Sequence, residues 1–156
     1  MILRAALLML GLLCALPAQA ACRVSATTLA FSSYNPFSIL PRDQTGRVTV
    51  TCDGVLSALL VSYRIKLSAG LYGSYATRKL GTGSDRLNYN LYLPPPLGLY
   101  TVVWGDGSGG SAYLEDSYLL GILTQSRNYD VYGRIPAQQN VAPGTYGDTI
   151  TVTLEY

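Results

Sequence analysis

The sequence contains no histidine. Without an imidazole, Ser-His and Cys-His nucleophile pairs and imidazole-based metal sites are excluded. Charged residues are also scarce, at 13% of the chain, and they never form a run. No basic run is present that would bind nucleic acid or an anionic lipid surface. These absences indicate a protein without a metal or another cofactor and without a nucleic-acid partner.

Carboxylates are few, and most lie where turns are expected. A general acid and base of the glycosidase type would have to come from six of them, Asp85, Asp106, Glu115, Asp116, Asp130 and Asp148. Most of these neighbour Gly, Ser or Asn, which favours a role in turns. The glycine-rich segment 105–110 lacks the spaced oxygen ligands of a calcium loop. The sequence therefore predicts no catalytic residue, and an extracellular enzyme is the weakest alternative.

Long hydrophobic runs are missing too. The longest, residues 5–16, is shorter than the roughly 20 residues that a membrane-spanning helix needs. It is followed by Ala18, Gln19 and Ala20, a small-x-small pattern that signal peptidase accepts. We expect residues 1–20 to be a signal peptide and residues 21–156 to be one secreted domain without a transmembrane segment. Its 136 residues are enough for a single core.

Cysteine is rare, with three in the chain. Cys14 lies in the expected signal peptide, which leaves Cys22 and Cys52 as an even pair in an oxidising compartment. The default expectation is one disulfide between them. It would close a loop of about 30 residues and stabilise the fold by about 3 to 4 kcal/mol.

Alternation of apolar and polar residues is the main positive pattern. Near the C-terminus Ile150, Val152, Leu154 and Tyr156 alternate with Thr and Glu, as in a half-buried strand. Strands are predicted at residues 24–31, 47–52, 61–68, 87–93, 100–104, 129–135 and 147–156. Segments rich in Gly, Pro, Asn and Ser separate them. The pattern predicts an all-β protein, either an immunoglobulin-like antiparallel β-sandwich or a small barrel. Residues 119–124 fit a strand or a helical turn, and the count leaves open whether one strand is missing.

The mature chain resembles a known family, the spore coat protein U domain, which is shared with pilins of the archaic chaperone-usher pathway. The motifs that carry the resemblance follow Cys22 in order along the chain. They are LAFSSYNP (29–36), GRVTVTC (46–52), IKLSAG (65–70), RKL (78–80), LNYNLY (87–92), WGDG (104–107), VYGRIP (131–136) and GTYGDTITV (144–152).

The resemblance implies an immunoglobulin-like fold, no enzymatic activity, and a role in a secreted coat or in a surface pilus. A pilus subunit would pass through the periplasm, with a periplasmic chaperone and an outer-membrane usher as partners besides neighbouring subunits. In such pili each subunit lacks one strand, and a neighbour's N-terminal peptide fills the groove. Only Ala21 lies between the expected cleavage site and Cys22, so this chain is expected to accept a strand without donating one.

Two surfaces are candidates for contacts. The first is the face of Ile150, Val152, Leu154 and Tyr156, which is predicted to accept a strand or to contact the chaperone; the alternative is that these residues simply face the core. The second is an adhesive loop, for which the predicted residues are Leu97, Leu99, Tyr100, Tyr72 and Tyr75. The alternative is that several of these residues fold inward. Because Tyr rings stack on sugars, a soluble carbohydrate-binding module is a second functional hypothesis.

Overall fold

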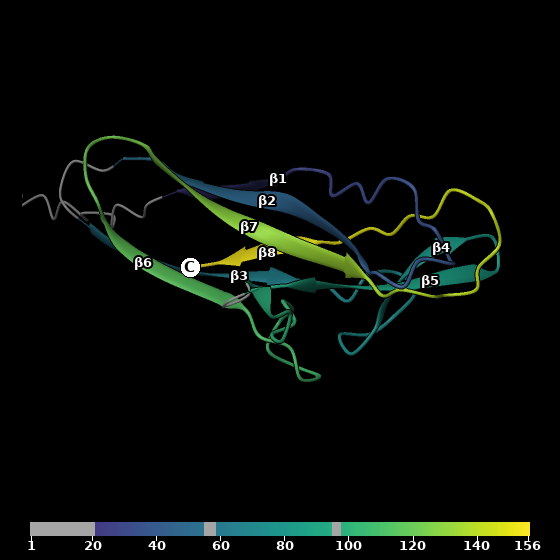
Figure 1. Cartoon of the computed structure of the whole chain (residues 1–156). Helices are drawn as coiled ribbons and strands as arrows, with labels where there is room; N and C mark the ends of the chain where they lie inside the picture. Colours follow the sequence, from purple (N-terminus) through teal and green to yellow (C-terminus); the bar gives the residue numbers. More distant parts are fainter. Residues whose placement is uncertain (1–20, 55–58, 95–97) are drawn as a thin grey trace, which may run out of the picture.

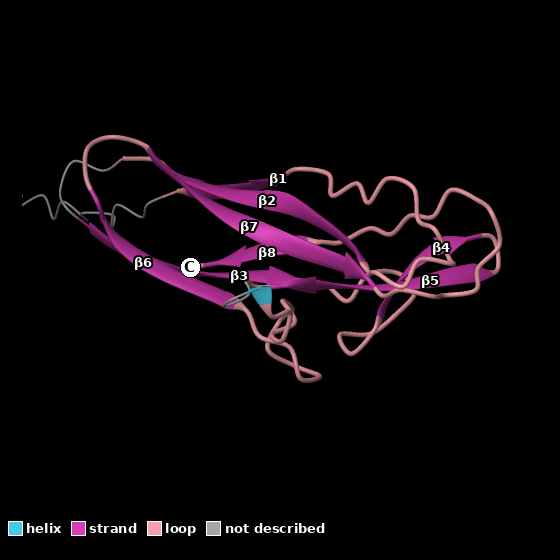
Figure 2. Ribbon diagram, viewed as in Figure 1, coloured by secondary structure: helices cyan, strands magenta, loops and turns pink. Residues whose placement is uncertain are grey.

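The structure, a computed structural model, describes residues 21–54, 59–94 and 98–156. The expected signal peptide and Leu97 therefore lie outside the described residues. In the described part the chain forms eight strands, shown in Figures 1 and 2. They are β1 (Cys22–Ala26), β2 (Arg42–Cys52), β3 (Leu59–Leu67), β4 (Arg78–Thr82), β5 (Asp85–Tyr92), β6 (Leu114–Leu120), β7 (Gln125–Ile135) and β8 (Val152–Glu155).

The strands form two sheets. The larger sheet has the order β1-β2-β7-β5-β4, and the smaller has the order β6-β3-β8. Neighbouring strands within each sheet pair antiparallel. Strands β7 and β2 lie above β3 and β6 in Figure 1, so the two sheets enclose a layer of side chains. The prediction of an all-β, antiparallel sandwich is confirmed.

The core follows from the alternation that the sequence predicts. On β3 the odd-numbered residues Val61, Tyr63 and Ile65 are buried while their even-numbered neighbours face solvent or are half-buried. Trp104 is fully buried, and its indole N–H donates to the Ile65 carbonyl at 2.9 Å. Burial of such large side chains stabilises the sandwich by roughly 25 cal/mol for each Å² of apolar area removed from water.

One charged side chain lies inside this core. Arg78 of β4 is 0% exposed, and its guanidinium donates hydrogen bonds to the Ser68 carbonyl, the Trp104 carbonyl and Asn90 Oδ1 at 2.7–3.0 Å. Burial lowers the pKa of Arg78. The bonds to two carbonyls and an amide oxygen satisfy four of the five N–H donors of the guanidinium, and such pairing is what a buried charge requires.

Several strand boundaries differ from the prediction. The first strand was expected over residues 24–31 but ends at Ala26, and the last begins at Val152, five residues after the predicted start. Residues 100–104 form only isolated bridges at Val103 and Trp104. The ambiguous segment 119–124 divides, because Leu119 and Leu120 end β6 and residues 121–124 connect to β7. Strands β4 and β6 were not predicted.

Candidate functional site

A groove opens between the two sheets where β1 and β8 stop covering the core. These two edge strands approach each other. Beyond them, residues 26–34 form one rim of a cavity of about 1000 Å³ and residues 141–150 form the other. Apolar side chains of the core line the bottom of the groove, namely Leu67, Leu80, Leu87, Tyr89, Leu91, Val131 and Ile135.

Glycines shape the floor under the first rim. Gly46 of β2 and Gly133 of β7 face the interior, and the side chain of Leu29 lies over both of them. A Cβ at Gly133 would come within 2.7 Å of the Phe31 ring. Phe31 is 8% exposed and meets Tyr89 edge-on. Leu29 and Phe31 therefore anchor the rim by filling space that glycines leave.

Between its ends this rim has backbone N–H groups without a partner among the described residues, although the Phe31 carbonyl accepts a hydrogen bond from Arg42 Nε at 2.7 Å. The Thr27 N–H donates to the Arg47 carbonyl, and Tyr34 Oη donates to the Pro136 carbonyl. Among the described residues, no backbone N–H of residues 28–34 donates a hydrogen bond. Ser32 has a φ of 57°, a left-handed conformation that non-glycine residues seldom adopt. A backbone segment with free donors beside an apolar floor is an arrangement that can take up another strand.

The second rim is fastened by a carboxylate. Asp148 accepts hydrogen bonds from the Leu71 N–H and the Tyr89 hydroxyl at 2.8 and 2.7 Å. Burial and the neighbouring Asp148 carboxylate raise the pKa of Tyr89, so this hydroxyl keeps its proton and remains a donor. Backbone bonds between Gly147 and Gly81 run in both directions. The rim that leads into β8 is thus tied to the β3–β4 connection and to β4 and β5.

The predicted acceptor face is divided between groove and surroundings. Ile150 and Val152 line the groove. Leu154 is half-buried and packs on the core, while Tyr156 is 69% exposed. The opposite rim was not among the predicted site residues, although the motif LAFSSYNP that contains it was recognised.

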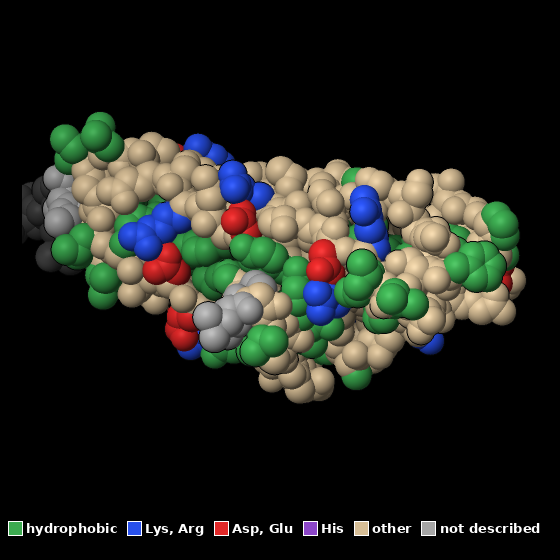
Figure 3. All heavy atoms as spheres, in the orientation of Figure 1, with side chains coloured by type: hydrophobic (Ala, Val, Ile, Leu, Met, Phe, Trp, Pro, Cys, Tyr) green, Lys and Arg blue, Asp and Glu red, His purple; other side chains and the backbone are tan. Residues whose placement is uncertain are grey.

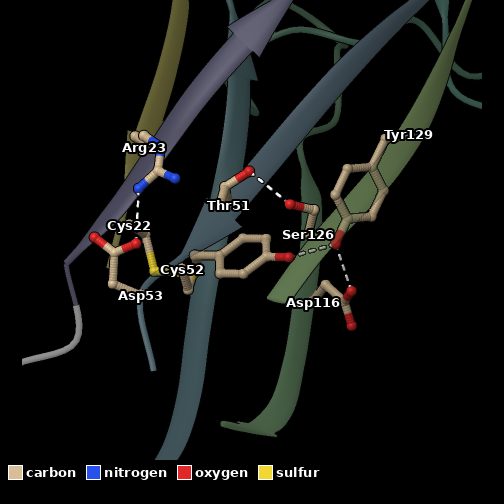
Figure 4. The surroundings of a disulfide bond; sticks show 9 residues. Cys22, Arg23, Thr51, Cys52, Asp53, Asp116, Ser126 and Tyr129 are labelled. Carbon is tan, nitrogen blue, oxygen red and sulfur yellow. Dashed lines mark hydrogen bonds and ion pairs between the residues drawn. A yellow bond between two sulfur atoms is a disulfide. The ribbon is translucent and has the colours of Figure 1, made fainter. Parts of the chain in front are cut away.

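The disulfide lies at the far end of β1 from the groove. Cys22 and Cys52 pair across β1 and β2 and are joined, as Figure 4 shows. The predicted disulfide is confirmed, and it joins the start of the first strand to the end of the second. Arg23 and Asp53 flank it with an exposed ion pair at 2.8 Å. The bond fastens β1 to the sheet, so the rim continues from a fixed strand.

The residues predicted for an adhesive loop lie in separate surroundings. Tyr72 packs against Gly81 and under Arg86, and Tyr75 lies beside Gly105. Tyr100 is half-buried, with the Arg134 guanidinium 3.7 Å from its ring centroid. Leu99 is 59% exposed. The structure shows no single cluster of these side chains in the described residues, and the adhesive role of the loop stays a prediction.

Apolar side chains are exposed at both ends of the molecule, where Figure 3 shows green patches. Near the disulfide end, Leu60 and Leu119 pair across β3 and β6 and are 64% and 68% exposed. Ile122 and Leu123 in the next connection are 74% and 73% exposed. At the other end of β2 lie the exposed residues Phe37, Ile39 and Leu40. Sequence reasoning missed these groups because their pattern is that of strands and turns.

Within the described part of the chain, no helix is long and apolar enough to cross a membrane. No group of three or more His, Cys, Asp or Glu side chains gathers there in a way that could hold a metal ion.

Comparisons with known proteins agree with this fold. One of the matching solved structures is the complex of chaperone and tip adhesion subunit from the archaic chaperone-usher Csu pili of Acinetobacter baumannii, with a TM-score of 0.56 and 20% identity. The match covers 88% of this chain but 40% of that chain, and at this identity it shows a common fold.

Sequence comparison is more specific. Protein U of Myxococcus xanthus is 34% identical over 143 residues, which cover 83% of this chain and 72% of Protein U. The family model of the Spore Coat Protein U domain matches residues 10–153. The chain therefore belongs to the Spore Coat Protein U domain family.

Proposed function

We propose that the chain is a structural subunit of a pilus or coat at the cell surface, and that it accepts an extended strand of a neighbouring subunit in the groove. The observation that carries the proposal is the unpaired rim of residues 28–34 above an apolar floor. A subunit of this kind passes through the periplasm, where a chaperone covers the same groove before an usher assembles the subunit. The role is structural, with no catalytic step.

An added strand would satisfy both parts of the groove. Its backbone would pair with the free N–H groups of the rim, and every second side chain would point between the sheets. There it would cover partly buried residues such as Leu80 and Ile150. An open groove leaves apolar side chains and unpaired backbone exposed to other chains. Filling it is therefore expected to stabilise the subunit and to prevent aggregation.

A synthetic strand tests this proposal. The probe is a peptide of about eight residues with alternating Val and Thr and a lysine at each end, which is the length of the rim at about 3.3 Å per residue. Added to the mature chain, it is expected to raise Tm and to slow amide hydrogen exchange at residues 28–34. A peptide of the same composition in the order Val-Val-Thr-Thr is the control, because its apolar residues cannot all face one side.

Two variants locate the site. Ile150→Lys places a charge in the groove and is expected to abolish the response to the alternating peptide, whereas Thr151→Lys, at an exposed neighbouring position that does not line the groove, is expected to retain it. The proposal is wrong if amides 28–34 are already protected in the free, monomeric chain, or if both peptides act alike.

A second candidate role, adhesion, is favoured by the apolar end formed by Leu60, Leu119, Ile122 and Leu123. Residues 54–63 and 117–126 contain no charged side chain in the sequence. An uncharged, exposed apolar patch fits an apolar solid surface better than it fits a charged polymer. This end lies across the sandwich from the β4–β5 hairpin in Figure 1, so it stays exposed when a neighbour fills the groove.

Attachment to polystyrene measures the adhesive role. The double variant Leu60→Ser with Leu119→Ser is expected to reduce attachment strongly while Tm changes little, because both side chains face solvent. Leu99→Ser is the comparison for the loop predicted from the sequence. If the double variant attaches as well as the wild type, the apolar end is not adhesive. Selective binding to a glycan array would instead favour the carbohydrate-binding hypothesis.

A further inference from the structure

Strand β6 has an open edge of its own. Within the described chain it pairs with β3 alone. Directly after β3, the Ser68 N–H donates to the Thr151 carbonyl on the β8 side. The even-numbered residues of β3 therefore direct their backbone groups toward β8, and the odd-numbered residues direct theirs toward β6. Because Tyr63 pairs with Asp116, the backbone groups of Glu115, Ser117 and Leu119 point to the open edge.

Asp116 breaks the apolar pattern on this edge strand. It occupies the position between Leu114 and Tyr118 that alternation directs toward the core, and its side chain is 22% exposed. Its Oδ2 accepts hydrogen bonds from the Tyr129 hydroxyl and, at 2.8 Å, from Arg127 of β7. Figure 4 shows Asp116 and Tyr129 facing each other from different strands.

The same carboxylate caps the open edge. Its Oδ1 accepts from the Ser117 N–H at 2.7 Å, which is a donor that an incoming strand would need. Arg127 lies over the Tyr118 ring, 4.2 Å from its centroid, so a cation also covers this part of the edge. Inward-pointing charges on edge strands are a known means by which proteins prevent unwanted strand pairing.

We infer that Asp116 prevents strand addition at β6, so that the groove is the edge that takes a neighbouring strand. This inference rests on the proposed function, because it concerns which edge is used. An added strand at β6 would have to displace the Asp116 carboxylate from the Ser117 N–H and leave it near apolar side chains. A buried charge without its partners is costly, and the groove has no such carboxylate among its free donors.

Removing the carboxylate tests the inference. In Asp116→Leu the inward side of β6 becomes apolar throughout, and in Asp116→Asn the shape stays while the charge is lost. Both variants are expected to form concentration-dependent dimers in sedimentation velocity, more strongly with Leu. The amides of Glu115, Ser117 and Leu119 are expected to exchange roughly tenfold more slowly in the dimer. This is the protection of an amide that is hydrogen-bonded to the second strand about nine-tenths of the time.

Asp130→Leu is the matched control. It introduces the same side chain and removes an ion pair with Arg47, but on β7, which has a strand on either side. It is expected to leave the β6 amides unchanged. If the Leu variant does not fold, the Asn variant decides. Folded variants whose β6 amides exchange as in the wild type would overturn the inference. A failure of the groove proposal would appear elsewhere, at amides 28–34 with the peptide probe.

Discussion

Phe31 lies against Gly133 so closely that this position of β7 has no room for a side chain. The ring fills the space above the glycine, and with Leu29 it holds the rim of the groove to the sheet. Local packing between one aromatic residue and one glycine thus determines where the rim runs. The groove depends on this contact, because the rim would otherwise move away from the floor.

Gly133→Ala is expected to destabilise the fold by about 1 to 3 kcal/mol, since the added methyl group overlaps Phe31 and Leu29. Chemical denaturation measures the change. Gly121→Ala is the control, because a Cβ at Gly121 meets nothing within 4 Å. Equal effects of the two substitutions would contradict the packing described for the rim.

Replacing both cysteines by serine is expected to cost about 3 to 4 kcal/mol, from the loop entropy that the bond between Cys22 and Cys52 removes from the unfolded chain. Denaturation of the oxidised wild type, the reduced wild type and the double variant measures this. The reduced wild type should behave like the variant. If reduction leaves the free energy of unfolding unchanged, the backbone hydrogen bonds with β2 are enough to hold β1 in the sheet.

Arg78→Met removes the donors that satisfy the Ser68 and Trp104 carbonyls and Asn90 in the core. Each buried acceptor left without a partner costs about 1 to 3 kcal/mol, so a total loss of about 3 kcal/mol or more is expected in the free energy of unfolding. Arg64→Met, an exposed arginine on β3, is the control and should change stability little. If Arg78→Met leaves the free energy of unfolding unchanged, water can replace the guanidinium as the hydrogen-bond donor.

Acid should weaken the contact between β6 and β7. Partial burial opposes ionisation of Asp116, but the hydrogen bonds from Tyr129, Arg127 and the Ser117 N–H outweigh it, so the pKa of Asp116 lies below its ordinary value of 3.8. Its contribution to stability is then complete above pH 3.8 and is lost as the pH falls through the lower pKa of the folded state.

Unfolding free energies of the wild type and Asp116→Asn across pH 2 to 7 measure this contribution, because other groups titrate alike in both proteins. The difference between the two proteins should be constant near neutral pH and shrink below pH 3.8. A difference that stays constant down to pH 2 would mean that folding does not lower the pKa of Asp116.

Strands with clean alternation could be predicted from the sequence. The buried odd-numbered positions of β3 and the C-terminal half of β7 follow the predicted pattern. Strand β6 was missed because Asp116 places a charge on the inward face and so interrupts the alternation of apolar and polar residues. Strand β4 is short, and its buried residue is Arg78, whose burial only the surrounding carbonyls make possible.

The site could be predicted in part. Alternation identified Ile150 and Val152, which line the groove, because that rim leads directly into a strand. The other rim could not be derived, since alternation continues through Leu29 and Phe31 although pairing with β2 ends. Its position depends on glycines of two different strands. The apolar end was missed because a leucine such as Leu119 is expected in the core unless the side of the strand that faces solvent is known.

In the proposed assembly, the left-handed conformation of Ser32 would interrupt the pairing of a neighbouring strand with this side of the groove. The accepted strand would therefore change direction at Ser32, between a part that pairs with residues 28–31 and a part that pairs with residues 33 and 34. One serine would thereby set the path that an accepted strand takes across this subunit.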